Sequence, residues 1–509
     1  MKKLLFIILL ITSLFALSCN HNKLSSTSSI GNIGEITVDP YKVTPLSAVY
    51  RTASVNAAPI TVTVKGLYGE PDIIHTYPAG YGTEFEIHGM FPESQNTIEV
   101  NDGGRIITKN VSIGTLSYNG VTIQKKYDVE INNLPEEEYP NNPELYFVES
   151  DIGFTIGSSR NGYIRYFIQN YTMSKIIIDN KKLYAYPNAH IKIINLLGKT
   201  IINYPEWSHH DTIKIDNDYV FFNNSFVGSV EEGFTKIDTF GKKIENNKSV
   251  GTLIKDIVYN NNDPQEIEIF KKIVFGSSVE NYYKYNGQVK NVDWFHANSL
   301  VYDSSKDILY VSGRMRGVLA IDYSEWKLLW WMVDNNLKLR IDPSIPSDNV
   351  VPYDKHFKDL ESLKSYRVMG DGATDGPKNQ HALFLHKNGN LGMFDNQGDE
   401  DTNPNGSRYV EYKITGTHGN YQAQKVYEYR NPSLYSRLRS DIDFTGENYQ
   451  NLLLCYADNN ARILEIEKNT KKGLFKLNLT FQAYRVDKLP LYYDEGRVYS
   501  EDCNLKNPN

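Results

Sequence analysis

The stretch HDTIKIDNDYVFF, residues 210–222, decides the fold of most of the chain. A histidine precedes a short alternating run, a polar turn follows, and a second apolar run completes the unit. Apolar residues at every second position, interrupted by Asp and Asn, are typical of two strands joined by a tight turn. The stretch therefore predicts a β-hairpin with a polar residue at its entrance.

The same unit returns further along the chain. NSLVYDSSKDILYV at residues 298–311 and HALFLHKNGNLGMF at 381–394 repeat it, and SDIDFTGENYQNLLLC at 440–455 is a weaker copy. Two-strand units repeated tens of residues apart indicate a β-propeller, because each blade buries its faces only against its neighbours. We therefore expect an all-β protein with a propeller over residues 144–509 and a short surface helix near 359–365.

A smaller unit precedes the propeller. ITVTV at residues 60–64 alternates strictly, TIEV at 97–100 repeats the pattern, and NDGG at 101–104 is a turn signal. These features predict a small β-sandwich domain over residues 35–133. The run PEEEYPNNP, within residues 134–143, is rich in proline, glutamate and asparagine and is expected to be a linker.

The first residues resemble an export signal. Lys2 and Lys3 precede an apolar run to Leu17 that is short for a membrane span, so residues 1–18 are expected to be a signal peptide. Cys19 then begins a polar tether, residues 19–34. We expect a periplasmic or cell-envelope protein that touches the membrane only through lipid on Cys19, with ordinary cleavage near Ser18 as the alternative.

Composition excludes several classes of protein. The chain has 509 residues, 40% of them hydrophobic and 12% aromatic, which is enough for a packed core and argues against disorder. The net charge of -7 argues against a nucleic-acid-binding surface. Besides Cys19, only Cys455 and Cys503 are present, and both a disulfide between them and a buried thiol at Cys455 remain open.

The entrances of the repeats carry the candidate chemistry. His210, Asn298 and His381 occupy the same place in three copies, and equivalent blade positions face each other across a propeller axis. His296 and Arg314 flank the second copy. An arginine with imidazole and amide donors suits an oxyanion such as a sulfuryl or phosphoryl group, and a neutral imidazole can serve as a nucleophile.

The adjacent His209, His210 and Asp211 allow a second interpretation. Two histidines and a carboxylate can ligate a metal ion, which would make the protein a metal-dependent hydrolase. No zinc-protease motif or paired-cysteine spacing accompanies them, so we expect neither a metal nor a cofactor. Strand phase favours His210 over His209 as the residue that faces the site. His209 is then expected to contact substrate beside it.

Several longer stretches resemble one family. The bacterial arylsulfate sulfotransferases are resembled most by DWFHANSLVYD at residues 293–303 running into VSGR at 311–314. The resemblance continues in HHD at 209–211, QHA at 380–382 and MFDN at 393–396. DPYKVTPLSAV at 39–49, GMFP at 89–92 and NTI at 96–98 resemble the small β domain of that family. The resemblance thus extends over both expected domains.

The resemblance implies a specific reaction on a six-bladed propeller. Such enzymes move a sulfuryl group from a phenolic sulfate ester to a phenolic acceptor without a nucleotide sulfate donor. His381 would attack sulfur in a ping-pong mechanism and become a sulfohistidine. His210, His296, Asn298 and Arg314 would hold the sulfonate oxygens. Small phenols are then the expected partners, together with a second copy of the chain in a homodimer. The alternative is a propeller that binds a ligand without catalysis.

Overall fold

The computed structural model describes residues 31–494 and residue 497, with gaps. The segments that it does not describe within this range are 172, 180–181, 188–191, 204–207, 224–231, 276–283, 286–287, 290–293, 315, 338–354 and 399–404. The expected signal peptide, Cys19 and Cys503 therefore lie outside the described residues.

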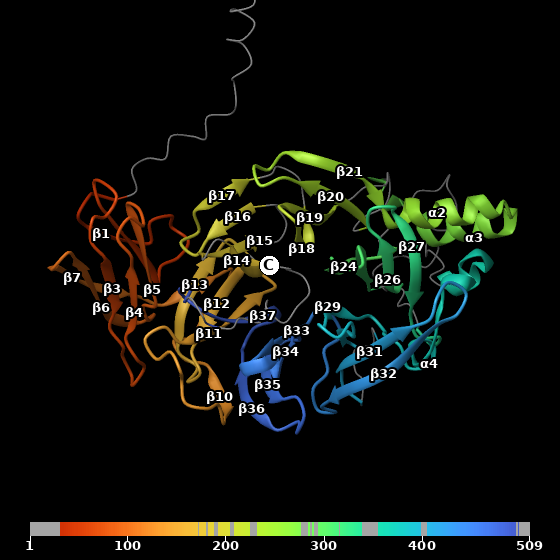
Figure 1. Ribbon diagram of the computed structural model, residues 1–509. Coiled ribbons are helices and arrows are strands. Elements are labelled where there is room, and N and C mark those ends of the chain that lie inside the picture. The colour runs from red at the N-terminus through yellow and green to blue at the C-terminus, as the bar shows by residue number, and fades with distance from the viewer. Residues whose placement is uncertain are drawn as a thin grey trace, which may run out of the picture.

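The first domain consists of two packed sheets, seen at the left of Figure 1. One contains β1 (Ile36–Val38), β2 (Ser47–Arg51) and β5 (Glu84–His88), and the other contains β3 (Ile60–Val64), β4 (Ile73–Tyr77), β6 (Ser94–Asp102) and β7 (Arg105–Ile113). Every second residue of β3 is buried, as its alternating sequence predicts. These side chains pack against those of β2 and β5, so the domain is a β-sandwich.

The second domain contains six sheets of four or five strands, and Figure 1 shows them arranged around a common centre. In chain order of their inner strands they are β14–β17 (Met173–Asp179, Lys182–Pro187, Lys192–Asn195, Thr200–Asn203); β18–β21 (His209–Ile215, Asp218–Asn223, Gly233–Ile237, Lys243–Ser249); β24–β27 (Ala297–Asp303, Ile308–Gly313, Gly317–Asp322, Lys327–Met332); β29–β32 (His381–Leu385, Leu391–Asp395, Arg408–Thr415, Tyr421–Arg430) with β28 (Val368–Gly370); β33–β36 (Asp441–Thr445, Asn451–Tyr456, Arg462–Glu467, Gly473–Asn478); and β37 (Ala483–Pro490) with β11–β13 (Glu144–Ser150, Phe154–Ser158, Ile164–Gln169). The four hairpins expected from the repeats begin four of these sheets, which confirms the β-propeller.

The last strand closes the ring. β37 pairs with β11, so the sheet of β11–β13 takes its inner strand from the far end of the chain. A second long-range strand pairing joins the segment after the β-sandwich to the last complete sheet of the propeller. β10 (Asp128–Asn132) falls within the range expected for the first domain, yet it pairs with β36 at the edge of a propeller sheet. The propeller thus begins before the expected linker.

Two helices interrupt the β structure between β21 and β24. α2 (Val250–Asn261) begins at Ser249, whose hydroxyl accepts a hydrogen bond from the Thr252 amide, and α3 (Pro264–Phe275) packs beside it. The sequence expectation left this pair out. The expected helix near residues 359–365 is instead two 3₁₀ turns, Phe357–Asp359 and Glu361–Tyr366. No helix among the described residues is long and apolar enough to cross a membrane.

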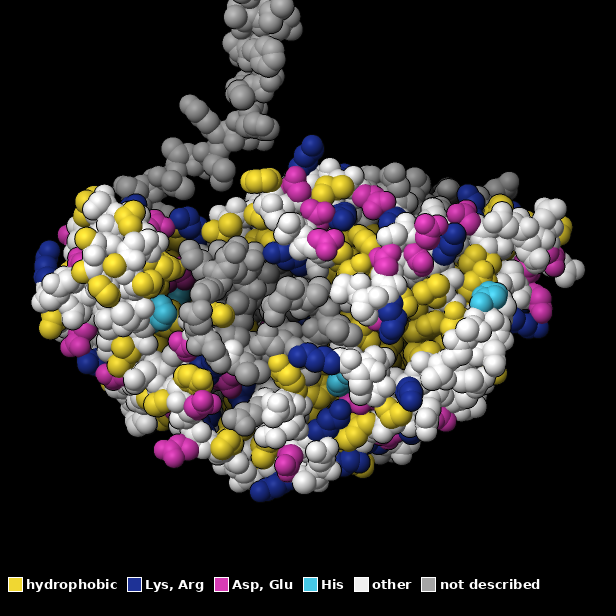
Figure 2. Space-filling model, in the orientation of Figure 1, with side chains coloured by type: hydrophobic (Ala, Val, Ile, Leu, Met, Phe, Trp, Pro, Cys, Tyr) yellow, Lys and Arg dark blue, Asp and Glu magenta, His cyan; other side chains and the backbone are white. Residues whose placement is uncertain are grey.

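One apolar cluster joins the sandwich to the propeller. It combines side chains of β2, β3 and β5 with those of β11–β13 and β37. Arg165 of β13 reinforces the junction, since its buried guanidinium donates to the Gly89 carbonyl at 2.7 Å and lies over the Phe91 ring at 4.1 Å. Charged side chains of both signs are interspersed over the face in Figure 2.

Candidate active site

The candidate residues lie where the inner strands begin. The six inner strands β14, β18, β24, β29, β33 and β37 contact one another around the ring. Five of them carry a register shift near their first residues, at positions 173–175, 209–212, 297–299, 381–383 and 483–486. A β-bulge of this kind redirects side chains and is common beside active sites. The repeated bulge therefore directs one short segment of each strand toward the same end of the ring.

Backbone strain accompanies the bulges. His210, His296 and Ala382 have positive φ values of 62°, 54° and 49°, and Arg439 before β33 has 59°. A residue with a side chain pays of order 1–3 kcal/mol for this conformation, so it persists only where surrounding structure enforces it. His210 and Ala382 lie within the bulges of their strands, and His296 and Arg439 precede theirs, so the strained residues gather near the first residues of four inner strands.

His381 is buried and held at both ring nitrogens. Its Nδ1 lies 2.9 Å from Asn396 Oδ1 and 3.1 Å from the Asn379 carbonyl, both of which are acceptors. Its Nε2 accepts a hydrogen bond from the Arg439 amide at 3.2 Å. The proton therefore resides on Nδ1, and the Nε2 lone pair is covered by one long hydrogen bond.

The surroundings of His381 keep it neutral. Burial lowers its pKa well below the usual value and outweighs the hydrogen bond to Asn396, which raises the pKa, while the nearby charges of Arg314, His210 and His296 lower it further. These four residues come from three different sheets, as the repeat alignment predicts. A neutral imidazole can act as a nucleophile once its Nε2 lone pair is released from the Arg439 amide.

Asn396 fixes the orientation of the His381 ring. Its amide Nδ2 donates to the Ser436 carbonyl at 2.8 Å and to the Arg439 carbonyl at 3.2 Å, so its Oδ1 faces Nδ1 of His381. Asn396 belongs to the MFDN motif at residues 393–396, and the motif alone predicts no role for it. A side chain one residue beyond a neighbouring strand has no local signal that connects it with His381.

His210 and His296 lie side by side, with ring centroids 5.0 Å apart. Nδ1 of His210 is 2.5 Å from the hydroxyl of Tyr484, a buried residue of β37. Burial raises the pKa of Tyr484, which keeps the hydroxyl protonated. The side chain of His209 lies outside what the structure describes, although its backbone in β18 pairs with Phe222 of β19.

Arg314 and Asn298 complete the set predicted from the sequence. The Arg314 amide donates to the His296 carbonyl at 2.9 Å, which ties the turn after β25 to the entrance of β24. Asn298 is buried, and its Nδ2 donates to the Gln380 carbonyl at 2.8 Å, beside His381. Asn298 therefore has a structural role between two inner strands.

Arg485 of β37 connects the entrances of three inner strands, and the sequence analysis missed it. It is buried within the ring, and its guanidinium donates to the His210 carbonyl at 2.9 Å and to the Asn298 carbonyl at 3.3 Å. It also lies 3.3 Å from the Asp211 carboxylate. Because Arg485 belongs to the strand that closes the ring, closure of the propeller and assembly of the site depend on the same residue.

Asp211 has a structural task in place of the metal ligation considered for it. Its Oδ2 accepts from the Leu300 amide at 2.8 Å and from the Ser299 hydroxyl at 3.2 Å, and its Oδ1 faces Arg485. Within the described residues, no group of three or more His, Cys, Asp or Glu side chains is arranged to hold a metal ion. Cys455 is a buried residue of β34, and its pairing with Cys503 stays a prediction.

Comparisons with known proteins agree with the resemblance. One curated relative, the arylsulfate sulfotransferase AssT of Escherichia coli O6:H1 (strain CFT073), is 28% identical over 170 residues, which are 30% of this chain and 26% of that protein. Solved structures that match include the Cps50 (Swd1) β-propeller domain of Myceliophteria thermophila, which is 10% identical. The match covers 71% of this chain and 88% of that domain, with a TM-score of 0.35. AztD of Citrobacter koseri matches at 10% identity, 87% and 100% coverage and a TM-score of 0.30.

Two family models match in the order of the two domains. The arylsulfotransferase Ig-like domain matches residues 35–115, the range of the β-sandwich. The arylsulfotransferase (ASST) model matches residues 132–486, from β10 to β37, and includes each candidate residue named above. The chain therefore belongs to the arylsulfotransferase (ASST) family.

Proposed function

We propose that the protein transfers a sulfuryl group from a phenolic sulfate ester to a phenolic acceptor, with His381 as the covalent carrier. The observation that carries the proposal is the buried, neutral His381, whose Nδ1–H is held by Asn396 and whose neighbours include Arg314. Membership of the arylsulfotransferase family supports the same chemistry. The reaction draws on the chain's own side chains and uses no nucleotide sulfate donor.

In the first half-reaction, Nε2 of His381 attacks sulfur. The N–S bond forms as the S–O bond to the aryl group breaks, and the electron pair leaves on the phenolate oxygen. A phenolate has a pKa near 10, so a proton from an imidazolium at His210 or His296 would assist its departure. The transition state is loose by analogy with phosphoryl transfer, so charge stabilisation dominates. Arg314, Asn298 and the two histidines would hold the sulfonate oxygens, with His209 as a further substrate contact.

In the second half-reaction, the acceptor phenol takes the place of the departed one. Its oxygen attacks sulfur, the N–S bond breaks, and the phenolic proton passes to the imidazole that lost its proton before. His381 returns to its neutral form. Splitting the transfer in this way lets one site serve donor and acceptor in turn, which is a ping-pong mechanism.

The proposal is tested with 4-nitrophenyl sulfate as donor, with and without added phenol. We expect sustained release of nitrophenol only with the acceptor, none with His381→Ala, and normal rates with His418→Ala, a matched control on an exposed histidine. Sustained release without acceptor would identify a hydrolase, and loss of activity with a chelator would point to a metal. Absence of turnover with any phenol would favour the binding propeller.

Export and assembly remain part of the proposal. The sequence of residues 1–19 supports a periplasmic or cell-envelope location with lipid on Cys19, and the family resemblance supports a homodimer. Fractionation of cells expressing the full chain and Cys19→Ser tests the anchor. We expect the full chain in the membrane fraction and the variant in the soluble fraction, and equal distribution would remove the anchor.

A further inference from the structure

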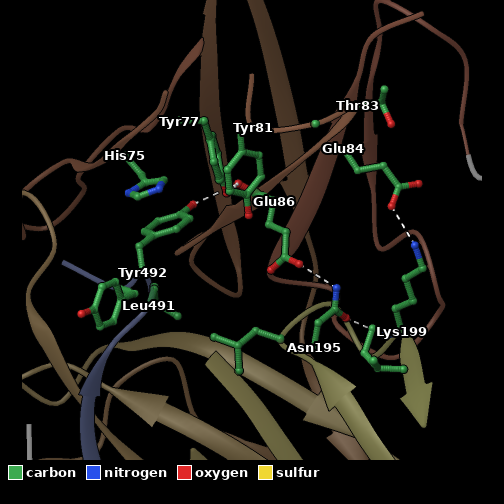
Figure 3. A pocket seen from close by; sticks show the side chains of 14 residues that line it. His75, Tyr77, Tyr81, Thr83, Glu84, Glu86, Asn195, Lys199, Leu491 and Tyr492 are labelled. Atoms are coloured by element: carbon green, nitrogen blue, oxygen red, sulfur yellow. Dashed lines mark hydrogen bonds and ion pairs between the residues drawn. The ribbon is translucent and has the colours of Figure 1, made fainter. Parts of the chain in front are cut away.

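A pocket of about 320 Å³ lies where the β-sandwich meets the propeller, apart from the residues of the candidate active site. Its walls come from β4 and β5, from β16 and β17, and from the segment after β37. The volume is at the lower end of the range for small-molecule sites. Figure 3 shows that aromatic rings gather on one side of the pocket and polar side chains on the other.

The aromatic wall is rigid and uncharged. The His75 ring stacks on the Tyr492 ring, with 4.3 Å between the ring centroids. The Tyr77 ring lies edge-on to His75 with a centroid distance of 4.5 Å, and the Tyr81 centroid lies 4.6 Å from that of Tyr77. Burial lowers the pKa of His75 to about 4, so its imidazole is neutral at physiological pH. Tyr77 donates its hydroxyl to the Glu86 carbonyl at 2.8 Å, which fixes its ring in place.

The polar wall carries charged groups that are engaged in hydrogen bonds and ion pairs. The Glu84 carboxylate lies 2.8 Å from Lys199 Nζ and 3.4 Å from Arg51 Nε. The Glu86 carboxylate accepts a hydrogen bond from the Asn195 side-chain amide at 2.6 Å and lies 3.0 Å from His88 Nε2. Of these charged groups, Glu84, Glu86 and Lys199 line the pocket, so its wall has one more negative than positive charge. Such a wall offers both donors and acceptors while it disfavours an anionic ligand.

We propose that this pocket binds a sugar ring. A pyranose has an apolar C–H face that packs on aromatic rings and a rim of hydroxyls that both donate and accept, which matches the two walls. A phenol has one hydroxyl and would leave most of the polar wall without a partner. The volume suits one or two sugar rings. The proposal is independent of sulfuryl transfer, because none of the lining residues belongs to the candidate active site.

Titration calorimetry on the mature full chain tests the proposal. The probes are methyl β-glucoside, methyl β-galactoside, methyl α-mannoside, methyl β-glucuronide and 4-nitrophenol. We expect at least one neutral glycoside to bind, and the glucuronide to bind more weakly than the glucoside. Tyr81→Ala and Glu86→Gln should each weaken binding by about tenfold or more, which corresponds to the loss of a ring contact or of a hydrogen bond to a charged group.

Tyr259→Ala, on the exposed side of α2, is the matched control and should bind like the wild type. Circular dichroism and thermal melting establish that each variant is folded, and Glu86→Gln keeps the shape of the wall if Tyr81→Ala does not fold. Failure of all three neutral glycosides to bind would overturn the proposal. Binding that survives both substitutions, or binding of 4-nitrophenol alone, would overturn it as well.

Discussion

Asn396 offers a decisive test of how His381 is prepared for attack. In the wild type, the pKa of His381 is far below 6.5, so the nucleophile is neutral throughout the neutral pH range. Asn396→Asp would place a carboxylate 2.9 Å from Nδ1 and stabilise the imidazolium, which raises the pKa of His381. Asn396→Ala would remove the hydrogen bond without adding charge.

The expected magnitudes follow from the contacts. A single hydrogen bond contributes about 0.5–1.5 kcal/mol, and the Asn379 carbonyl at 3.1 Å still accepts from Nδ1 after Asn396→Ala. We therefore expect Asn396→Ala to slow the first half-reaction about three- to tenfold at every pH. For Asn396→Asp we expect a new loss of rate as the pH falls through the raised pKa of His381.

The assay measures the burst of nitrophenol that the first half-reaction releases, by stopped-flow absorbance at pH values from 5 to 9. Wild type and Asn396→Ala should give profiles without an inflection from His381 near neutral pH. Asn396→Asp should give a profile that rises with pH. If all three profiles have the same shape, Asn396 affects packing alone and the account of His381 is wrong. Thermal melts of the variants separate loss of fold from loss of rate.

Other substitutions test separate parts of the structure. Arg314→Ala should cost about 2–4 kcal/mol in kcat/KM with little change in melting temperature, and unchanged turnover would remove Arg314 from the site. Arg408→Met should lower the free energy of unfolding by about 3–5 kcal/mol in denaturant titrations, because it removes the cation 2.9 Å from buried Asp395 and leaves that carboxylate with neutral donors alone. An unchanged midpoint would show that the pair is not a net contributor. His75 has a lowered pKa, so below pH 6.5 the unfolded state binds more protons and stability falls with pH toward about 4. His75→Phe should flatten this slope between pH 6.5 and 4, and an equally steep slope would contradict the assignment.

Local patterns predicted much of the fold. The alternating strands on either side of polar turns gave β18–β19, β24–β25, β29–β30 and β33–β34, because strand and turn preferences act over a few residues. The helices α2 and α3 were missed although Val250, Leu253, Ile254 and Val258 are buried with helical spacing. This helical spacing extends over one short segment between two β-rich repeats, and it was not recognised as a helix.

His210, Asn298 and His381 could be aligned because they precede equivalent strands of three repeats, and His296 and Arg314 were found because they flank one of them. Tyr484 and Arg485 could not, since they reach the site through the pairing of β37 with β11, more than 300 residues earlier in the chain. Asn396 contacts His381 from the end of the neighbouring strand of the same sheet, and the Arg439 amide contacts it from the next sheet, and no local pattern encodes either contact. The sequence therefore indicated the groups that we propose to react and left out the groups that orient them.

The central claim is that His381 carries the sulfuryl group. Intact-mass analysis of the protein after incubation with an aryl sulfate alone, followed by peptide mapping, tests it most directly. The account predicts one added sulfuryl group, located on His381, absent from His381→Ala and removed when a phenol is added. An unmodified protein that nevertheless turns over donor and acceptor, or a sulfuryl group on another residue, would contradict it.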